Sequence, residues 1–207
     1  MDFRRLIVKL APAARWRLAS SEGFVTLPPV RHCEDVLQGY LEGVSPAPVR
    51  FGFALVSDTQ LLMRFYRESQ SRRRIRAADT IFAANLWTAW LLQALYGAQV
   101  PVCSTLDVVQ RTFEVCRPND RVLWVGSGGD GVRALGRRFG LTDVRIHPAE
   151  GALDLTAVFD FLENNSPFRF CLLALPSAAR EAIAHAVFCR QRARGLALCL
   201  RPLQRFP

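Results

Sequence analysis

Short apolar runs alternate along most of this chain with longer segments in which apolar residues recur every three or four positions. The short runs have the length of buried strands, and the longer segments have the period of amphipathic helices. The predicted strands are residues 49–56, 81–83, 122–125, 143–146, 168–175 and 195–200. The predicted helices are residues 34–42, 59–69, 86–96, 132–139, 155–164 and 182–188.

Strands and helices that alternate with short connections predict an α/β fold with a Rossmann-like parallel sheet flanked by helices. In such a sheet the ligand crevice lies at the carboxyl ends of the strands. A chain of 207 residues suits a single domain. We divide it into an N-terminal basic arm with a first helix at residues 1–48, an α/β core at 49–200, and a short basic tail at 201–207.

The segment between Asp79 and Asp107 contains no charged residue, which raises the question of a membrane-spanning helix. Polar residues and a proline interrupt the segment, namely Asn85, Gln93, Gln99 and Pro101. We therefore predict that the helix at residues 86–96 belongs to the core of the protein.

The most distinctive stretch is RVLWVGSGGDGVRALGRRFG at residues 121–140, where an apolar run meets a glycine cluster and then a helical pattern. It predicts a strand, a tight turn and a helix. Glycines let the backbone adopt positive φ, and free N–H groups at the start of a helix favour an anion. A phosphate-bearing ligand is the leading hypothesis, and an ordinary βα turn without a ligand is the alternative. The residues of this turn are Gly126, Ser127, Gly128, Gly129 and Gly131.

Net charge and the positions of cysteine and histidine limit the kinds of partner and of metal site that the chain can have. The net charge of +9 favours anionic partners, without choosing among nucleotide sugars, lipid phosphates and nucleic acid. The six cysteines form no C-x-x-C motif, and we interpret them as core thiols in a reducing cytoplasm. Histidines and cysteines show no ligand spacing, so we expect no protein-bound transition metal.

Five segments taken together resemble a known family. They are similar, in order and spacing, to the motifs of the WecG/TagA/CpsF family of bacterial glycosyltransferases, and the resemblance covers residues 49–199. The segments are ADTIF at 78–82, STLD at 104–107, VLWVGSGG at 122–129, EGALD at 150–154 and FCLLALP at 170–176.

The resemblance implies a donor, an acceptor and a cellular setting. Members of the family transfer an N-acetylmannosamine-type sugar from a UDP donor to a polyprenyl-linked sugar at the cytoplasmic membrane face, in exopolysaccharide or cell-envelope polysaccharide assembly. It implies a nucleotide sugar, a polyprenyl-phosphate lipid or anionic membrane surface, and an active glycosyltransferase as partners, with no nucleic acid and no cofactor beyond the UDP-sugar. We expect a cytoplasmic protein at the periphery of the inner membrane. The implied substrate-binding residues are Asn85, Asp107, Gly126, Ser127, Gly128, Gly129 and Gly131.

The sequence departs from the family pattern at the positions of the proposed catalytic and phosphate-binding residues. The family's proposed catalytic Asp-Gly aligns with Ala84-Asn85, and an alanine cannot accept a proton. An expected arginine aligns with Val102, and the family's Lys-Gln-Glu aligns with residues 177–179, which read SAA. We therefore predict an impaired or repurposed glycosyltransferase, a pseudoenzyme, in which Asp58 and Asp107 are the remaining candidates for a catalytic base.

Two other classes of function stay open. The segment VLWVGSGGDG also resembles the first motif of S-adenosylmethionine-dependent methyltransferases, but Trp124 occupies the place of that motif's usual acidic residue. Glu150 is then the sole candidate for the acid that binds the ribose. The other class is a non-catalytic interaction module that uses its basic face to bind a membrane or a protein.

Overall fold

The computed structural model describes residues 38–39, 41–45, 48–96, 102–149 and 154–202. Most of the predicted N-terminal arm and of the predicted tail therefore lies outside the described residues. Residues 38–39 and 41–43 are helical, which extends one residue beyond the helix predicted at 34–42.

Six strands form one sheet in which every pairing is parallel, which confirms the predicted Rossmann-like α/β fold. The strand order is β2-β1-β6-β5-β3-β4. The strands are β1 (Phe51–Ser57), β2 (Thr80–Ala83), β3 (Arg121–Gly126), β4 (Asp143–His147), β5 (Phe170–Ala174) and β6 (Gly195–Leu200). The helices are α3 (Thr59–Arg67), α4 (Ser69–Arg76), α5 (Leu86–Tyr96), α6 (Thr105–Val115), α7 (Gly129–Arg138), α8 (Leu155–Asn164) and α9 (Ser177–Arg190).

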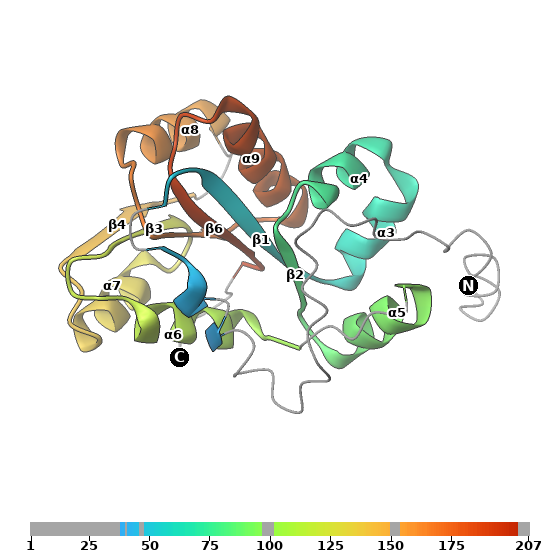
Figure 1. Ribbon diagram of the computed structural model, residues 1–207, viewed down its shortest axis with the longest axis horizontal. Helices are drawn as coiled ribbons and strands as arrows, with labels where there is room; N and C mark the ends of the chain where they lie inside the picture. Colours follow the sequence, from blue (N-terminus) through green and yellow to red (C-terminus); the bar gives the residue numbers. More distant parts are fainter. Residues whose placement is uncertain (1–37, 40, 46–47, 97–101, 150–153, 203–207) are drawn as a thin grey trace.

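The direction in which the chain steps across the sheet determines which face each helix covers, because parallel crossovers are right-handed. The steps from β1 to β2, β4 to β5 and β5 to β6 run one way, whereas those from β2 to β3 and β3 to β4 run the other way. Figure 1 shows the result, with α3, α4, α8 and α9 above the sheet and α5, α6 and α7 below it.

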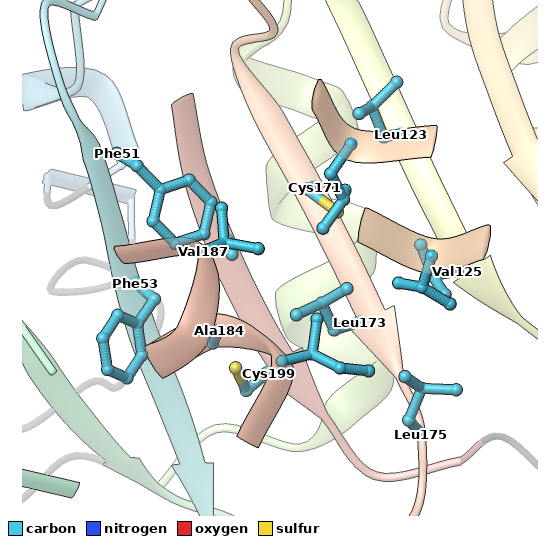
Figure 2. Close-up of a cluster of buried hydrophobic side chains, with 14 of the residues drawn as sticks. Phe51, Phe53, Leu123, Val125, Cys171, Leu173, Leu175, Ala184, Val187 and Cys199 are labelled. Carbon is cyan, nitrogen blue, oxygen red and sulfur yellow. The ribbon is translucent and has the colours of Figure 1, made fainter. Parts of the chain in front are cut away.

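The central strands are buried on both faces, which explains why they read as continuous apolar runs. Along β5, Phe170 and Leu172 join the cluster below the sheet, while Cys171 and Leu173 join the cluster above it. Figure 2 shows the upper cluster, where side chains of β1, β3, β5 and β6 pack against α9. The two clusters hold the sheet rigidly between its helix layers, so the carboxyl ends of the strands form a fixed edge.

Two helices were not predicted from the sequence. The arginine-rich residues of α4 carry no apolar period, and the helix that they form buries only Ser71 and Ile75. Helix α6 buries Val108, Val109 and Phe113, whose spacing of one and four residues was an available helical signal.

Helix α5 begins and ends at the predicted residues, but the prediction that it belongs to the core is wrong for its outer face. Thr88 and Leu92 are buried, whereas Leu86 and Trp87 are 77% and 73% exposed and Trp90 is 48% exposed. Apolar residues occur all round this helix, so its sequence does not distinguish the face that contacts the sheet from the face that is exposed. No helix among the described residues is long and apolar enough to span a bilayer.

Among the described residues, the interpretation of the cysteines as core thiols holds for the buried Cys171 and Cys199 and is wrong for Cys103. Cys116 and Cys189 are also thiols, but Cys116 is half-buried and Cys189 is exposed. Cys103 is disulfide-bonded. A disulfide requires two cysteines whose Cβ atoms lie within about 4 Å of each other, and sequence spacing does not reveal that proximity. The free thiols are Cys116, Cys171, Cys189 and Cys199.

Asp79 joins the start of β2 to β1 through both its main chain and its side chain. Its N–H donates to the carbonyl of Phe53 at 2.8 Å, and its Oδ2 accepts from the Phe53 N–H at 2.8 Å. A Cβ at Gly52 would overlap this carboxylate, so the glycine allows its approach. Burial raises the pKa of Asp79 above its ordinary value of 3.8, against the opposing effects of the Phe53 hydrogen bond and Arg50.

We predict that Asp79→Asn raises the free energy of unfolding at neutral pH, because it keeps an acceptor for Phe53 and removes a buried charge. The pKa of Asp79 in the folded protein is above 3.8, its value in the unfolded chain. The wild type therefore loses stability as the pH rises from 3.8 through the folded pKa, whereas the variant does not. The stability gained by the variant disappears at pH values below 3.8. Urea unfolding as a function of pH measures this difference.

Asp143→Asn is the control with the opposite sign. Burial raises the pKa of Asp143, but hydrogen bonds from Arg121 and Arg145 outweigh it and lower the pKa. Its neutralisation therefore lowers stability at neutral pH, and this loss shrinks as the pH falls through the folded pKa. Shifts of the same sign in both variants would contradict the account.

Candidate functional site

The predicted site residues all lie at the carboxyl edge of the sheet, but they fall into three separate groups. Asn85 and Asp107 lie near the end of β2, because the Cys103 N–H before α6 donates to the Ala83 carbonyl at 2.8 Å. Asp58 follows β1, and the glycine turn follows β3. With about 4.8 Å between neighbouring strands, β1 is about 14 Å and β2 about 19 Å from β3 across the sheet. The structure therefore does not unite them in one small site.

Packing and backbone geometry explain the glycine turn. Gly126 has φ +149°, and a Cβ there would lie 2.7 Å from the carbonyl oxygen of Ala174. Gly128 adopts the left-handed conformation, with φ +77°. A Cβ at Gly129 would lie 2.7 Å from Cγ2 of Ile146. At least part of the glycine pattern thus serves the close approach of β3 to β5 and of α7 to β4.

A buried tryptophan fixes the outer part of the turn. The indole Nε1–H of Trp124 donates to the Ser127 carbonyl at 3.0 Å, and the ring itself is fully buried in the cluster below the sheet. Ser127 is half-buried and Gly128 is exposed. The turn is therefore held from below while its outer surface remains accessible.

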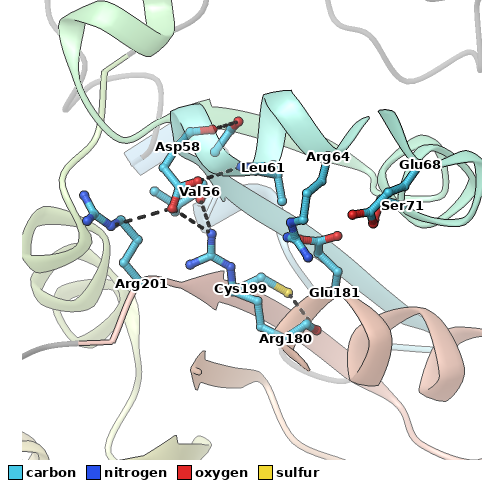
Figure 3. Close-up of polar contacts among 11 residues, drawn as sticks. Val56, Asp58, Leu61, Arg64, Glu68, Ser71, Arg180, Glu181, Cys199 and Arg201 are labelled. Carbon is cyan, nitrogen blue, oxygen red and sulfur yellow. Dashed lines mark hydrogen bonds and ion pairs between the residues drawn. The ribbon is translucent and has the colours of Figure 1, made fainter. Parts of the chain in front are cut away.

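Asp58 occupies a buried position at the end of β1, where it caps α3. Its Oδ1 accepts from the Leu61 N–H at 2.8 Å. Its Oδ2 lies 3.4 Å from Nη2 of Arg180 and 3.7 Å from Nε of Arg201 (Figure 3). Both oxygens are thus engaged, so Asp58 is poorly placed to act as a free catalytic base.

Arg180 and Glu181 extend this cluster into the protein. Both side chains are buried, Nη2 of Arg180 donates to the Val56 carbonyl at 3.3 Å, and Glu181 pairs with Arg64. Burial lowers the pKa of Arg180 below its ordinary value, against the opposing effects of Cys199, Asp58 and Glu181. The network ties α9 to β1 and α3, which is a structural role.

The other polar candidates also cap helices. Asn85 Oδ1 accepts from the Thr88 N–H at 2.9 Å at the start of α5. Asp107 and Ser104 form a reciprocal capping box at the start of α6, with hydrogen bonds of 3.0 and 3.1 Å. Ala84, at the aligned catalytic position, packs against the cluster below the sheet. The geometry offers no unengaged carboxylate at these positions.

Capping separates the helices that directly follow strands into two groups. Side chains cap α3, α5 and α8, through Asp58, Asn85 and Asp154. Within the part of the chain that the structure describes, α7 and α9 start without a side-chain cap, after Gly128 and Pro176. The first N–H groups of a helix have no partner within the helix. At α9 the Ala179 N–H already donates to the Pro176 carbonyl at 2.9 Å, so the amides that these two starts offer are those of residues 129–131 and 177–178.

The two uncapped helices follow neighbouring strands and leave the sheet on opposite faces. β3 pairs with β5 up to Gly126 and Ala174, and then α7 passes below the sheet while α9 passes above it (Figure 1). Such a point, where neighbouring strands connect in opposite directions, is where open α/β sheets bind ligands. The carboxylate of Asp130, in the first turn of α7, is fully exposed and faces Arg133 at 3.4 Å.

Sequence reasoning missed Arg180, and it placed Arg201 only in a basic tail. The available signal was a charged pair, Arg180 and Glu181, next to the apolar stripe of a helix that follows a buried strand. No protein-family model and no curated protein sequence matches the chain. Among the described residues, no group of three or more His, Cys, Asp or Glu side chains is arranged to hold a metal ion.

We predict that Asp58→Ala costs much more stability than Asp154→Ala, although both remove an aspartate cap. Loss of a cap alone costs about 1 kcal/mol, whereas Asp58 also leaves a buried arginine without its carboxylate, for a total of about 3 kcal/mol. Urea unfolding of the two variants tests this, with Asp58→Asn as a variant that keeps the cap and loses the charge. Equal losses for both alanine variants would show that the arginine contacts contribute nothing.

Proposed function

We propose that this chain is a glycosyltransferase-like protein that binds a nucleotide sugar at the turn between β3 and α7 and does not itself transfer the sugar. The proposal rests on the two uncapped helix starts, α7 and α9. They follow the neighbouring strands β3 and β5, at the point where the chain leaves the sheet towards opposite faces. Helix N-termini bind phosphates through free backbone N–H groups and the helix dipole.

We infer that the protein does not transfer the sugar because its candidate carboxylates already have structural roles. A transferase needs a carboxylate that is free to take a proton from the acceptor hydroxyl. Ala84 offers none at the aligned position, and Asp58 and Asp107 are committed to capping and ion pairs. Nucleotide-sugar binding without turnover is therefore the function that suits this set of residues.

The cellular role rests on the family resemblance. We propose that the protein works in the cytoplasm, at the periphery of the inner membrane, and assists an active glycosyltransferase in exopolysaccharide or cell-envelope polysaccharide assembly. The polyprenyl-phosphate-linked acceptor would then be handled by that active partner.

We predict that UDP and a UDP-N-acetyl sugar bind the wild type in calorimetric titration and that Gly128→Asp weakens the binding at least about tenfold, through repulsion of the diphosphate. Gly128→Asn is the matched control, because asparagine and aspartate both tolerate left-handed φ better than other residues. The neutral variant should retain binding within a small factor.

Three outcomes would overturn the proposal. Equal weakening by both variants would assign the effect to backbone strain and not to the phosphate. Binding of S-adenosylhomocysteine in place of UDP would favour the methyltransferase class, despite Trp124 at the position of that motif's acid. Release of product sugar in the presence of a lipid-linked acceptor would show that the protein retains transfer activity.

A further inference from the structure

Helix α5 presents an aromatic face with no covering element among the described residues. Leu86, Trp87 and Trp90 lie at helical spacing on its outer side, and the two indole rings are 6.1 Å apart in an edge-to-face arrangement. These are three of the seven large apolar side chains that are exposed in the described part of the chain. Clustered apolar exposure of this kind marks a contact surface.

The helix pair on the other side of the same sheet edge is strongly basic. Helices α3 and α4, residues 59–76, contain six arginines against one glutamate. Tyr66, Arg67, Arg73 and Arg76 are exposed. Figure 1 places α3, α4 and α5 at one end of the molecule, around the edge strand β2.

We propose that this end of the protein docks on the surface of an anionic lipid bilayer. The docking surface consists of Trp87 and Trp90 with Leu86 on α5, and of the exposed arginines Arg67 and Arg73 of α3 and α4. The indole rings would lie at the level of the lipid headgroups, where an apolar body and a polar N–H are both accommodated. The arginines would contact lipid phosphates.

Charge favours the bilayer over a second copy of the chain. An isologous dimer through this end would bring two arginine-rich helix pairs of the same sign towards each other. An anionic bilayer attracts the same groups, at about 1 kcal/mol for each arginine near the surface. The 27 residues from 80 to 106 carry no charge, so nothing on α5 itself opposes insertion.

The surface is distinct from the proposed nucleotide site, because β2 lies four strand positions from β3 in the sheet. Membrane docking rests on the peripheral location proposed above and would supply its surface, but it does not depend on the nucleotide site, so vesicle binding and UDP binding can fail separately. If both are correct, the protein would hold its nucleotide site beside a membrane without covering it.

The test is co-sedimentation of the full chain with vesicles of phosphatidylcholine alone or with added phosphatidylglycerol. We expect binding to the anionic vesicles, and a partition coefficient lowered about tenfold or more by Trp87→Ser/Trp90→Ser. Arg67→Gln/Arg73→Gln should lower it by a similar factor at low salt and reduce the preference for anionic lipid. Because all four side chains are exposed, thermal unfolding of the variants should match that of the wild type.

Matched controls remove the same chemistry elsewhere on the surface. Val49→Ser/Leu155→Ser removes two exposed apolar side chains, and Arg137→Gln/Arg138→Gln removes two exposed charges from the end of α7. Neither should change vesicle binding by more than about threefold. Equal losses in the control and test variants would overturn the proposal. A wild type that ignores vesicles would also overturn it, and sedimentation as a dimer that the tryptophan variant dissociates would assign the surface to a second copy.

Discussion

The parallel pairing of β3 with β5 is the constraint on which the rest of this structure depends. It brings Gly126 against Ala174, so closely that no side chain fits between them. It also makes α7 and α9 follow neighbouring strand ends, from which the two helices pass to opposite faces of the sheet (Figure 1). The right-handed crossovers then assign the remaining helices to their faces. A ligand crevice at this point follows from topology before any side chain is considered.

Side chains at the carboxyl edge are largely used to build the fold. Asp58, Asn85, Asp107 and Asp154 each cap a helix, and Asp58 also neutralises buried arginine. A carboxylate whose oxygens accept these hydrogen bonds stabilises the fold and is not available to accept a proton from a substrate. The two helix starts that lack such a cap are therefore chemically distinct from the others, and backbone amides are what they have to offer.

The apolar pattern predicted the strands and most helices, because burial on one or both faces imposes a period that the sequence must carry. It failed at α4, where arginines obscure the two buried positions, and at α6, whose buried Val108, Val109 and Phe113 were not recognised as a helical pattern. It also failed at the outer face of α5, where an uncharged surface resembles a core. The contact between Asp58 and Arg180 joins residues 122 positions apart, and no local pattern encodes it. The sequence also suggested one site from Asn85, Asp107 and the glycine turn, whereas the strand order separates them.

Amide hydrogen exchange with and without UDP is the measurement that tests the central claim most directly. The account predicts slower exchange on UDP binding in two separate segments, residues 127–132 at the start of α7 and residues 177–178 at the start of α9. The capped starts of α3, α5 and α8 should be unaffected. Protection of a capped helix start, or no protection at residues 127–132 while UDP binds, would contradict the assignment of the anion site to the point where β3 and β5 diverge.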